Sequence, residues 1–346
     1  MSDSSTRVES ALRLSVLDQS PIPAGAGGAA ALRNTLDLAR LADALGFHRY
    51  WVAEHHGTPG LACASPEVLI GPIASATQRI RVGSGGVMLP HYSPLKVAEN
   101  FSMLSGMFPN RIDLGIGRAA GTDPSTTFAL QRDRRHSPPD DFPSQLRELM
   151  SYVHGDMADD HPFAHLSRML PGRPGAPELW LLGSSPQSGI WAAELGLPYA
   201  FADFINAGGS EIMKRYARDF APGARHATPQ PAVAVWTICA DSEAEARRLA
   251  TSSEMMMAEL YRGRLIEVPP TEEAEAYLAR QGEGGLPIMG MRRRTVLGDP
   301  QQVRAGIEAV AAEYGAGEVL LVNILHDHAA RRRSYELVAE AFEMSR

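Results

Sequence analysis

Two histidines follow a run of apolar residues that is typical of a buried strand. The segment Glu54-His55-His56 comes directly after residues 47–53, which include Tyr-Trp-Val. Neighbouring residues of an extended chain point to opposite sides, so at most one of the two histidines is expected to face a pocket. A histidine in that place can act as a general base or hydrogen-bond donor near neutral pH. From the spacing alone, a histidine that caps the following loop is the favoured alternative.

A small polar segment, residues 183–188, reads Gly-Ser-Ser-Pro-Gln-Ser and follows a second apolar run. Proline is well suited to the first turn of a helix. The free backbone N–H groups of that turn would attract an anion, and the hydroxyls of Ser185 and Ser188 could add donors. The residues alone favour a phosphate site and an ordinary helix cap about equally.

Two glycine-rich segments also end expected strands. Residues 83–86 read Gly-Ser-Gly-Gly, which allows a ligand ring to approach the backbone closely or forms a bulge at a barrel corner. Residues 115–121 read Gly-Ile-Gly-Arg-Ala-Ala-Gly, one residue too long for a dinucleotide-binding fingerprint. Arg118 in this segment suits either a phosphate or a surface ion pair.

A second pair of histidines, in His326-Asp327-His328, follows the last expected strand. Alternation would place both on one side, where they could bind a metal together with His55. The matching His-x-His after the first strand is absent, because Asp18-Gln19-Ser20 stands there. A polar loop is therefore favoured, we predict no metal site, and a metal-dependent hydrolase stays the weaker alternative.

Eight short apolar segments are expected as strands, and helices with apolar residues at helical spacing separate them. The expected strands are residues 12–17, 47–53, 80–89, 112–116, 178–182, 199–202, 233–240 and 318–324. The expected helices are residues 29–45, 66–77, 94–104, 144–154, 186–195, 210–220, 242–261, 300–314 and 329–344. Strands that are apolar throughout favour a parallel sheet covered on both faces.

This order predicts an α/β fold, a (β/α)8 TIM barrel, with an open doubly wound sheet as the alternative. Two excursions leave the pattern, residues 121–175 after the fourth strand and residues 268–295 after the seventh. We expect one barrel domain over residues 1–346, with residues 1–11 as a flexible N-terminus. Active sites of such barrels lie at the carboxyl ends of the strands, where the polar segments above would meet.

Composition excludes several classes of protein. Hydrophobic residues make up 44% of the 346 and charged residues 21%, which is typical of a globular chain. The formal net charge is −7, which argues against binding nucleic acid. Two cysteines form neither a disulfide framework nor a zinc motif. No signal peptide or membrane-length apolar run is present, so we expect no membrane association and a cytoplasmic location.

In their joint order, several motifs resemble the bacterial luciferase-like flavin monooxygenase family, over residues 12 to about 325. The branch resembles the single-barrel group found among natural-product tailoring monooxygenases. The matching runs are residues 17–21 (Leu-Asp-Gln-Ser-Pro), 44–47 (Ala-Leu-Gly-Phe), 53–56 (Ala-Glu-His-His), 64–71 (Ala-Ser-Pro-Glu-Val-Leu-Ile-Gly), 86–90 (Gly-Val-Met-Leu-Pro), 111–115 (Arg-Ile-Asp-Leu-Gly), 183–188 (Gly-Ser-Ser-Pro-Gln-Ser) and 296–300 (Val-Leu-Gly-Asp-Pro).

The resemblance implies roles for individual residues. His55 matches the catalytic histidine of the family, and Glu99 matches a recurrent carboxylate whose role stays open. Gly85 and Gly86 match a non-prolyl cis peptide that faces the flavin ring. The implied cofactor-binding residues are Gly85, Gly86, Val87 and Met88 at the ring, and Arg118, Gly183, Ser184, Ser185 and Ser188 at the phosphate.

The chain departs from luciferase itself at two matching positions. Gly117 stands where luciferase has a cysteine, and Gly121 stands where it has a tyrosine. We therefore do not expect light emission.

The implied activity is that of a two-component flavoprotein monooxygenase. A separate flavin reductase supplies reduced FMN, molecular oxygen adds to it to give a flavin peroxide, and one oxygen atom passes to a small organic substrate such as a secondary metabolite. Some relatives use the deazaflavin coenzyme for hydride transfer instead, and a flavin-binding protein without turnover is a further alternative. A homodimer is also plausible for this family. An apolar or aromatic substrate is expected from Cys63, Met88, Tyr92, Phe128, Phe204 and Met291.

Overall fold

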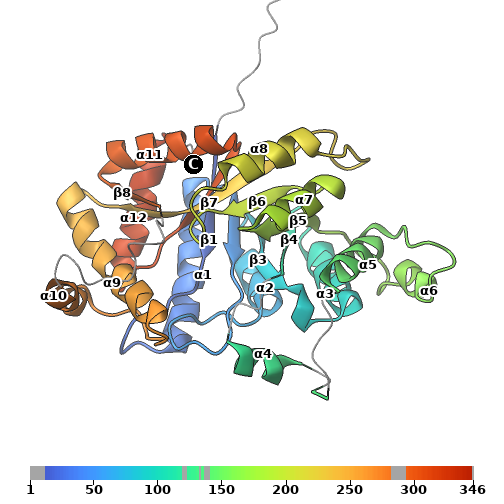
Figure 1. Ribbon diagram of the computed structural model, residues 1–346, viewed down its shortest axis with the longest axis horizontal. Helices are drawn as coiled ribbons and strands as arrows, with labels where there is room; N and C mark the ends of the chain where they lie inside the picture. Colours follow the sequence, from blue (N-terminus) through green and yellow to red (C-terminus); the bar gives the residue numbers. More distant parts are fainter. Residues whose placement is uncertain (1–11, 119–122, 132–133, 136–140, 282–293, 345–346) are drawn as a thin grey trace, which may run out of the picture.

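Eight parallel strands close into a barrel in the computed structural model, which describes residues 12–118, 123–131, 134–135, 141–281 and 294–344. Each strand pairs with the next, and the last pairs with both its predecessor and the first (Figure 1). The strands are β1 (Arg13–Asp18), β2 (Arg49–Val52), β3 (Arg81–Met88), β4 (Ile112–Gly117), β5 (Glu178–Gly183), β6 (Tyr199–Ala202), β7 (Pro231–Cys239) and β9 (Glu318–Val322). This closure confirms the predicted (β/α)8 fold, and the open sheet is wrong.

A ninth strand, β8 (Thr295–Gly298), lies outside the barrel and was not predicted. It pairs with Trp236–Cys239 at the carboxyl half of β7, while β9 pairs with Ala232–Trp236 at the amino half. Because β8 has only four residues, at the end of the second excursion, its apolar pattern is too short to be distinguished from a loop.

Helices surround the barrel, and their bounds agree with the predicted ones within a few residues. They are α1 (Gly28–Leu45), α2 (Pro66–Ala76), α3 (Pro94–Met107), α5 (Phe142–His154), α7 (Pro186–Glu194), α8 (Ser210–Asp219), α9 (Glu243–Tyr261), α11 (Pro300–Tyr314) and α12 (His328–Ala341). The excursions add α4 (Pro124–Leu130), α6 (Ala164–Arg168) and α10 (Thr271–Gln281), of which α6 and α10 lie at opposite edges of the molecule (Figure 1). No described helix is long and apolar enough to cross a membrane.

Local sequence fixes where these helices begin and end, as α11 illustrates. Asp299 accepts a hydrogen bond from the backbone N–H of Gln302 at 2.9 Å, and the Gln302 side chain accepts one from the N–H of Asp299 at 3.0 Å. This reciprocal capping box satisfies backbone donors that the helix itself leaves unpaired. Gly315 ends the helix at φ +59°, a conformation that glycine adopts without a steric cost.

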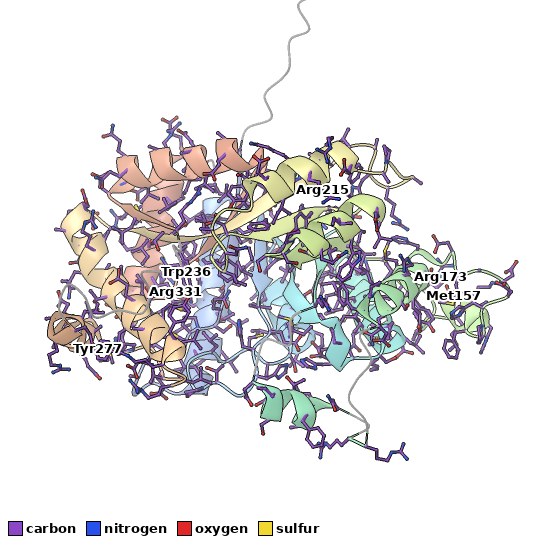
Figure 2. All side chains as sticks on the ribbon, viewed as in Figure 1. Met157, Arg173, Arg215, Trp236, Tyr277 and Arg331 are labelled. Atoms are coloured by element: carbon purple, nitrogen blue, oxygen red, sulfur yellow. The ribbon has the colours of Figure 1, made fainter. Side chains whose placement is uncertain are left out.

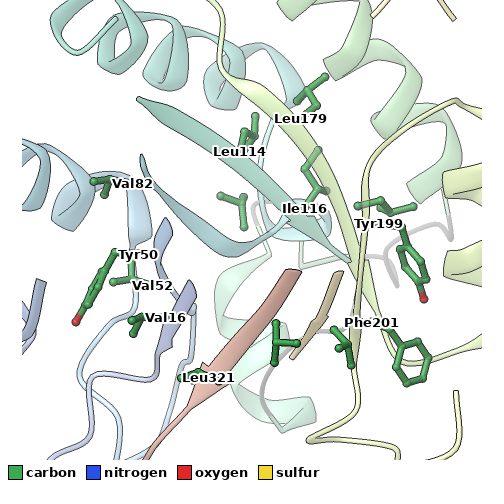
Figure 3. Close-up of a cluster of buried hydrophobic side chains, with 14 of the residues drawn as sticks. Val16, Tyr50, Val52, Val82, Leu114, Ile116, Leu179, Tyr199, Phe201 and Leu321 are labelled. Atoms are coloured by element: carbon green, nitrogen blue, oxygen red, sulfur yellow. The ribbon is translucent and has the colours of Figure 1, made fainter. Parts of the chain in front are cut away.

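The outward side chains of the strands form the main core against the helices. Figure 3 shows part of this layer, in which residues of neighbouring strands point away from the barrel axis toward the helices. The side chains labelled there are Val16, Tyr50, Val52, Val82, Leu114, Ile116, Leu179, Tyr199, Phe201 and Leu321. Since the strands are buried on both faces, the continuous apolar runs in the sequence are explained.

The barrel interior changes in character from one end to the other. At the amino ends of the strands, Arg49 lies between Asp113 and Glu318, with N–O distances of 2.9 Å to each. Above this charged layer the rings of Trp51 and Trp180 meet edge to face, with centroids 5.4 Å apart. Toward the carboxyl ends, several interior positions are glycine or alanine instead, namely Gly85, Gly115, Ala200, Ala202 and Ala234, beside Leu17, Leu182 and Leu320.

A buried aspartate joins four elements on the outside of β1. Asp18 accepts hydrogen bonds from Thr35 of α1 at 2.7 Å, from Tyr50 of β2 at 2.6 Å and from the backbone of Ser20 at 2.7 Å. Arg331 of α12 is 1% exposed and lies 2.5 Å from the same carboxylate (Figure 2). Burial alone would raise the pKa of Asp18, but Arg331 and these hydrogen bonds hold the pKa below its usual value.

Replacing Asp18 should destabilise the fold strongly. Asp18→Asn leaves the buried guanidinium of Arg331 without its counter-charge, and we expect a loss of about 3–5 kcal/mol in the free energy of unfolding. Urea unfolding at pH 7 measures this. Because the folded pKa is lowered, the stabilisation is present above the unfolded pKa of about 3.9 and is lost as the pH falls through the folded value.

The exposed pair of Glu211 with Lys214 on α8 provides the control. Glu211→Gln should leave the urea midpoint nearly unchanged, since exposed ion pairs contribute little. An equally small effect of Asp18→Asn would contradict the structural role of the buried pair.

Candidate functional site

A cavity of about 500 Å³ opens at the carboxyl ends of the strands. It exists because the interior positions there are small, so the side chains cannot fill the barrel at this end. Nine of the ten predicted site residues line it: His55, Gly85, Gly86, Met88, Arg118, Gly183, Ser184, Ser185 and Ser188. Val87 does not, because its side chain is buried in the outer core.

Strand alternation places His55 on the cavity side of its segment. Ala53 and His55 both line the cavity, whereas Glu54 between them is fully buried on the other side. Glu54 accepts hydrogen bonds from the backbone of Met88 at 2.9 Å and from Tyr92 at 3.0 Å. Its carboxylate also lies 2.7 Å from Nε2 of His56. The expectation that only one histidine faces the pocket is confirmed.

His55 has an unusual electrostatic environment. Its ring borders the cavity, but Nδ1 is buried and has no hydrogen-bond partner among the described residues. Burial lowers the pKa of His55 to about 4, and the neighbouring His56 pushes it in the same direction. The imidazole is therefore neutral near pH 7, with a nitrogen free to bind or exchange a proton with a ligand.

Glycines form a flat stretch of backbone at the cavity wall. The Gly85–Gly86 peptide is cis, as the resemblance implied. A Cβ atom at Gly86 would lie 2.8 Å from the carbonyl oxygen of Gly115 and from Cδ1 of Leu182. No larger residue fits there without moving its neighbours, so this part of the cavity wall has to be formed by glycine backbone.

The start of α7 supplies backbone donors at another side of the cavity. Ser185 caps this helix, and Ser188 donates its hydroxyl hydrogen to the Ser185 carbonyl oxygen at 2.8 Å. The Ser188 hydroxyl also lies 2.9 Å from the Tyr199 hydroxyl, so it is already engaged within the protein. Ser184, Ser185 and the first-turn N–H groups are thus the better placed donors for an anion.

Arg118 follows β4 and lines the same cavity. Its side chain is exposed, and its Cζ atom lies 5.6 Å from the ring centroid of Trp191, which is part of α7. A guanidinium beside a helix N-terminus is a favourable arrangement for a phosphate, because both contribute positive charge and N–H donors.

The remaining histidine segment does not take part in the site. His326 lies 3.4 Å from the carbonyl oxygen of Ala24, and His328 pairs with Asp37 at 2.9 Å. No group of three metal-binding side chains gathers anywhere in the described part of the chain. A hydrolase that binds a metal through His55, His326 and His328 therefore lacks its ligand set. Glu99 pairs with Lys96 on α3 and does not line the cavity.

Most of the apolar wall was not predicted. Of the expected substrate contacts, Met88 and Phe204 line the cavity, while Cys63, Tyr92 and Phe128 do not, and Met291 lies outside the described residues. The lining residues that sequence reasoning missed are Leu17, Gln19, Trp51, Phe142, Trp191, Ile205 and Leu320. Alternation with Ala53 and His55 could have identified Trp51.

The fold and cavity define a barrel whose mouth brings together the start of helix α7, a wall of glycine backbone and a histidine with a lowered pKa. Residues 12–318 match the family model of luciferase-like monooxygenases, and the chain belongs to this family.

Full-length relatives support this assignment. The uncharacterized protein YwcH of Bacillus subtilis (strain 168) is 44% identical over 95% of this chain and 98% of its own length. The N-acetyl-S-alkylcysteine monooxygenase of the same organism is 38% identical over 95% of this chain and 98% of its own length. The crystal structure of apo-MsnO8 superimposes with a TM-score of 0.88 at 41% identity, covering 97% of this chain and 99% of that one.

More distant solved structures share the fold alone. The oxygenating constituent of 3,6-diketocamphane monooxygenase in complex with FMN has a TM-score of 0.70 at 21% identity. An F420-dependent secondary alcohol dehydrogenase in complex with an F420-acetone adduct has a TM-score of 0.62 at 14% identity.

The protonation state of His55 gives a direct test of the site. We expect its imidazole to titrate with a midpoint of about 4 in the free protein, because protonation would place a charge in a desolvated position. Histidine NMR signals recorded between pH 3.5 and 8 measure this, with His55→Gln to assign the resonance.

His56→Gln serves as the control for the neighbouring charge. It should leave the His55 midpoint low, since burial is the larger cause of the shift. A His55 midpoint between pH 6 and 7 in the wild-type protein would contradict the described environment.

Proposed function

We propose that this protein is an FMN-dependent monooxygenase, which takes reduced FMN from a separate reductase and uses molecular oxygen to oxygenate a small organic substrate. The observation that supports this most is the single cavity in which the α7 N-terminus, the glycine wall and His55 meet. Family membership supports the oxygenating activity, and the more distant FMN complex has the same fold.

The residues present fit FMN as a ligand. Arg118, Ser184, Ser185 and the first turn of α7 would hold the phosphate, and Gly85, Gly86 and Met88 would lie against the ring. Nδ1 of His55 is buried and without a partner among the described residues, whereas Nε2 is not among the buried unpaired atoms and is the ring nitrogen that a ligand in the cavity could reach. When bound in its reduced form, FMN supplies the electrons that activate molecular oxygen.

The protein itself would position the cofactor and the substrate, exclude water from them and provide one proton-transfer group. The apolar wall, which includes Trp51, Phe204 and Leu320, would exclude water from the reacting atoms. His55 is held neutral, so it could accept a proton from an adjacent group and return it later. Gly115 and Gly117 lie within barrel strand β4 rather than in a dinucleotide-binding turn, which supports the supply of electrons by a separate reductase.

The deazaflavin coenzyme is the second candidate cofactor, since an F420-dependent dehydrogenase shares the fold. Anaerobic titration with reduced FMN and with the reduced deazaflavin, followed by admission of oxygen, tests the proposal. We expect saturable binding of reduced FMN and oxygen consumption. Binding of the deazaflavin alone would overturn the FMN assignment.

The N-acetyl-S-alkylcysteine monooxygenase that is 38% identical to this chain makes N-acetyl-S-alkylcysteines the first substrates to test. Analytical ultracentrifugation would test the expected homodimer.

Binding should depend on the phosphate group of the cofactor. Wild-type protein is expected to bind reduced FMN more tightly than reduced riboflavin, which has no phosphate. Arg118→Met should weaken FMN binding about 10- to 100-fold, because a charged hydrogen bond to the phosphate is lost, and should leave riboflavin binding the same. Fluorescence titration under anaerobic conditions measures both ligands. Arg215→Met on α8, an exposed arginine away from the cavity, is the matched control. Equal loss for both ligands in Arg118→Met would place the phosphate elsewhere.

Removing the imidazole should separate binding from turnover. His55→Gln is expected to bind reduced FMN as well as the wild-type protein and to form oxygenated product about 10²–10⁴-fold more slowly, since it lacks the proton-transfer group. Product formation from an N-acetyl-S-alkylcysteine with a flavin reductase, compared with FMN affinity, gives both values. Wild-type turnover in the variant would exclude this role.

A further inference from the structure

Gln19 is a buried amide that points at the cavity without a partner. It follows β1, lines the cavity and is only 4% exposed, yet its side chain forms no hydrogen bond with any described residue. The amide atoms of Gln19 are not among the buried side-chain atoms that lack a partner, so they face the open cavity, where a ligand can bind them.

The backbone around Gln19 holds the amide in this position. Ser20 adopts φ +49°, a left-handed conformation that is costly for a residue other than glycine. The N–H of Ser20 donates to Asp18 at 2.7 Å, and the Ser20 hydroxyl lies 2.9 Å from the Thr35 hydroxyl, which can accept its hydrogen. The carbonyl of Asp18 also accepts a hydrogen bond from Ala53 at 3.0 Å. Gln19 is thus fixed between two well-bonded residues rather than placed by chance.

The barrel topology separates Gln19 from the anion-binding side. β1 and β5 are four strands apart in either direction around the ring, so they lie on opposite sides of the mouth. Ser184 and Ser185 follow β5, whereas Gln19 and His55 follow the neighbouring strands β1 and β2. A cofactor held by its phosphate at β5 would therefore leave Gln19 on the far side of the cavity.

The surroundings of Gln19 are uncharged. The lining residues of β1, of the segment that ends β2 and of β9 are Leu17, Trp51, Ala53, His55 and Leu320, of which only His55 can ionise, and burial keeps its pKa low and its ring neutral near pH 7. No carboxylate of the described residues lines the cavity. An amide can both donate and accept a hydrogen bond but has no charge to balance an ion. Its complement in such a place is a neutral carbonyl or amide group on an otherwise apolar molecule.

We propose that Gln19 is a specificity residue that binds a neutral carbonyl-containing group of the organic substrate. The assignment to the substrate rests on the proposed function, while binding of a carbonyl at Gln19 can be measured without turnover. Arg118 and the serines of the β5–α7 segment would bind the cofactor, and Gln19 would determine which substrate binds next to the cofactor.

Acetophenone and ethylbenzene are suitable probes, because they differ only by a carbonyl group in place of a methylene group. Gln19→Met keeps the length of the side chain and removes both hydrogen-bonding atoms. We expect this variant to lose about 2- to 12-fold in affinity for acetophenone and to bind ethylbenzene as before. Quenching of tryptophan fluorescence or calorimetry measures both probes in the oxidised, FMN-loaded protein. Unchanged ethylbenzene binding also shows that the cavity is intact in the variant.

Gln230→Met is the matched control, because this glutamine precedes β7 at the opposite end of the barrel. It should change neither affinity. Unchanged acetophenone affinity in Gln19→Met, an equal loss for both probes, or no wild-type binding of acetophenone would overturn the proposal. A loss of FMN affinity in Gln19→Met would show that the amide binds the cofactor, and this result would also overturn the proposal. Failure of the wild-type protein to bind FMN would instead refute the proposed function, and the same probes tested without FMN would still decide whether Gln19 binds a carbonyl.

Discussion

The size of the side chains inside the barrel determines what the other features of this protein can do. Eight strands enclose a volume that must be filled for stability, and here only the amino-terminal part is filled, by Arg49 with its carboxylates and by the Trp51–Trp180 pair. Glycine and alanine at the carboxyl ends leave a cavity of about 500 Å³. Stability and ligand binding are therefore assigned to opposite ends of the same strands, as in other barrels of this class.

The polar groups around the cavity are arranged by the elements that close it. Asp18 fixes the end of β1 to α1, β2 and α12, and Glu54 fixes the end of β2 to the end of β3. These anchors lie behind the cavity wall, so Gln19 and His55 are presented to its interior while their neighbours are fully bonded. Such support is what a binding site needs if its polar groups are to stay in place without a ligand.

The sequence predicted the barrel and most of the site because both depend on short-range patterns. Apolar runs separated by helices specify eight strands, and His55, Arg118 and the 183–188 segment directly follow strands whose carboxyl ends must meet. Strand β8 was missed because it has only four residues, and helix α10 was missed because it lies in a segment that interrupts the alternation of strands and helices. Phe142 and Trp191 were missed as lining residues because helices bring them to the cavity, and no periodicity in the sequence indicates that packing. Neighbouring residues of a strand point to opposite sides, so the side chain of Val87 points outward into the core while that of Met88 points into the cavity.

A crystal structure of the protein soaked anaerobically with reduced FMN tests the central claim most directly. We expect the phosphate at the first turn of α7 beside Arg118 and the ring against Gly85 and Gly86, with Gln19 still facing open space on the far side. Density for FMN in any other cleft, or a phosphate placed beside β1 rather than β5, would contradict the account.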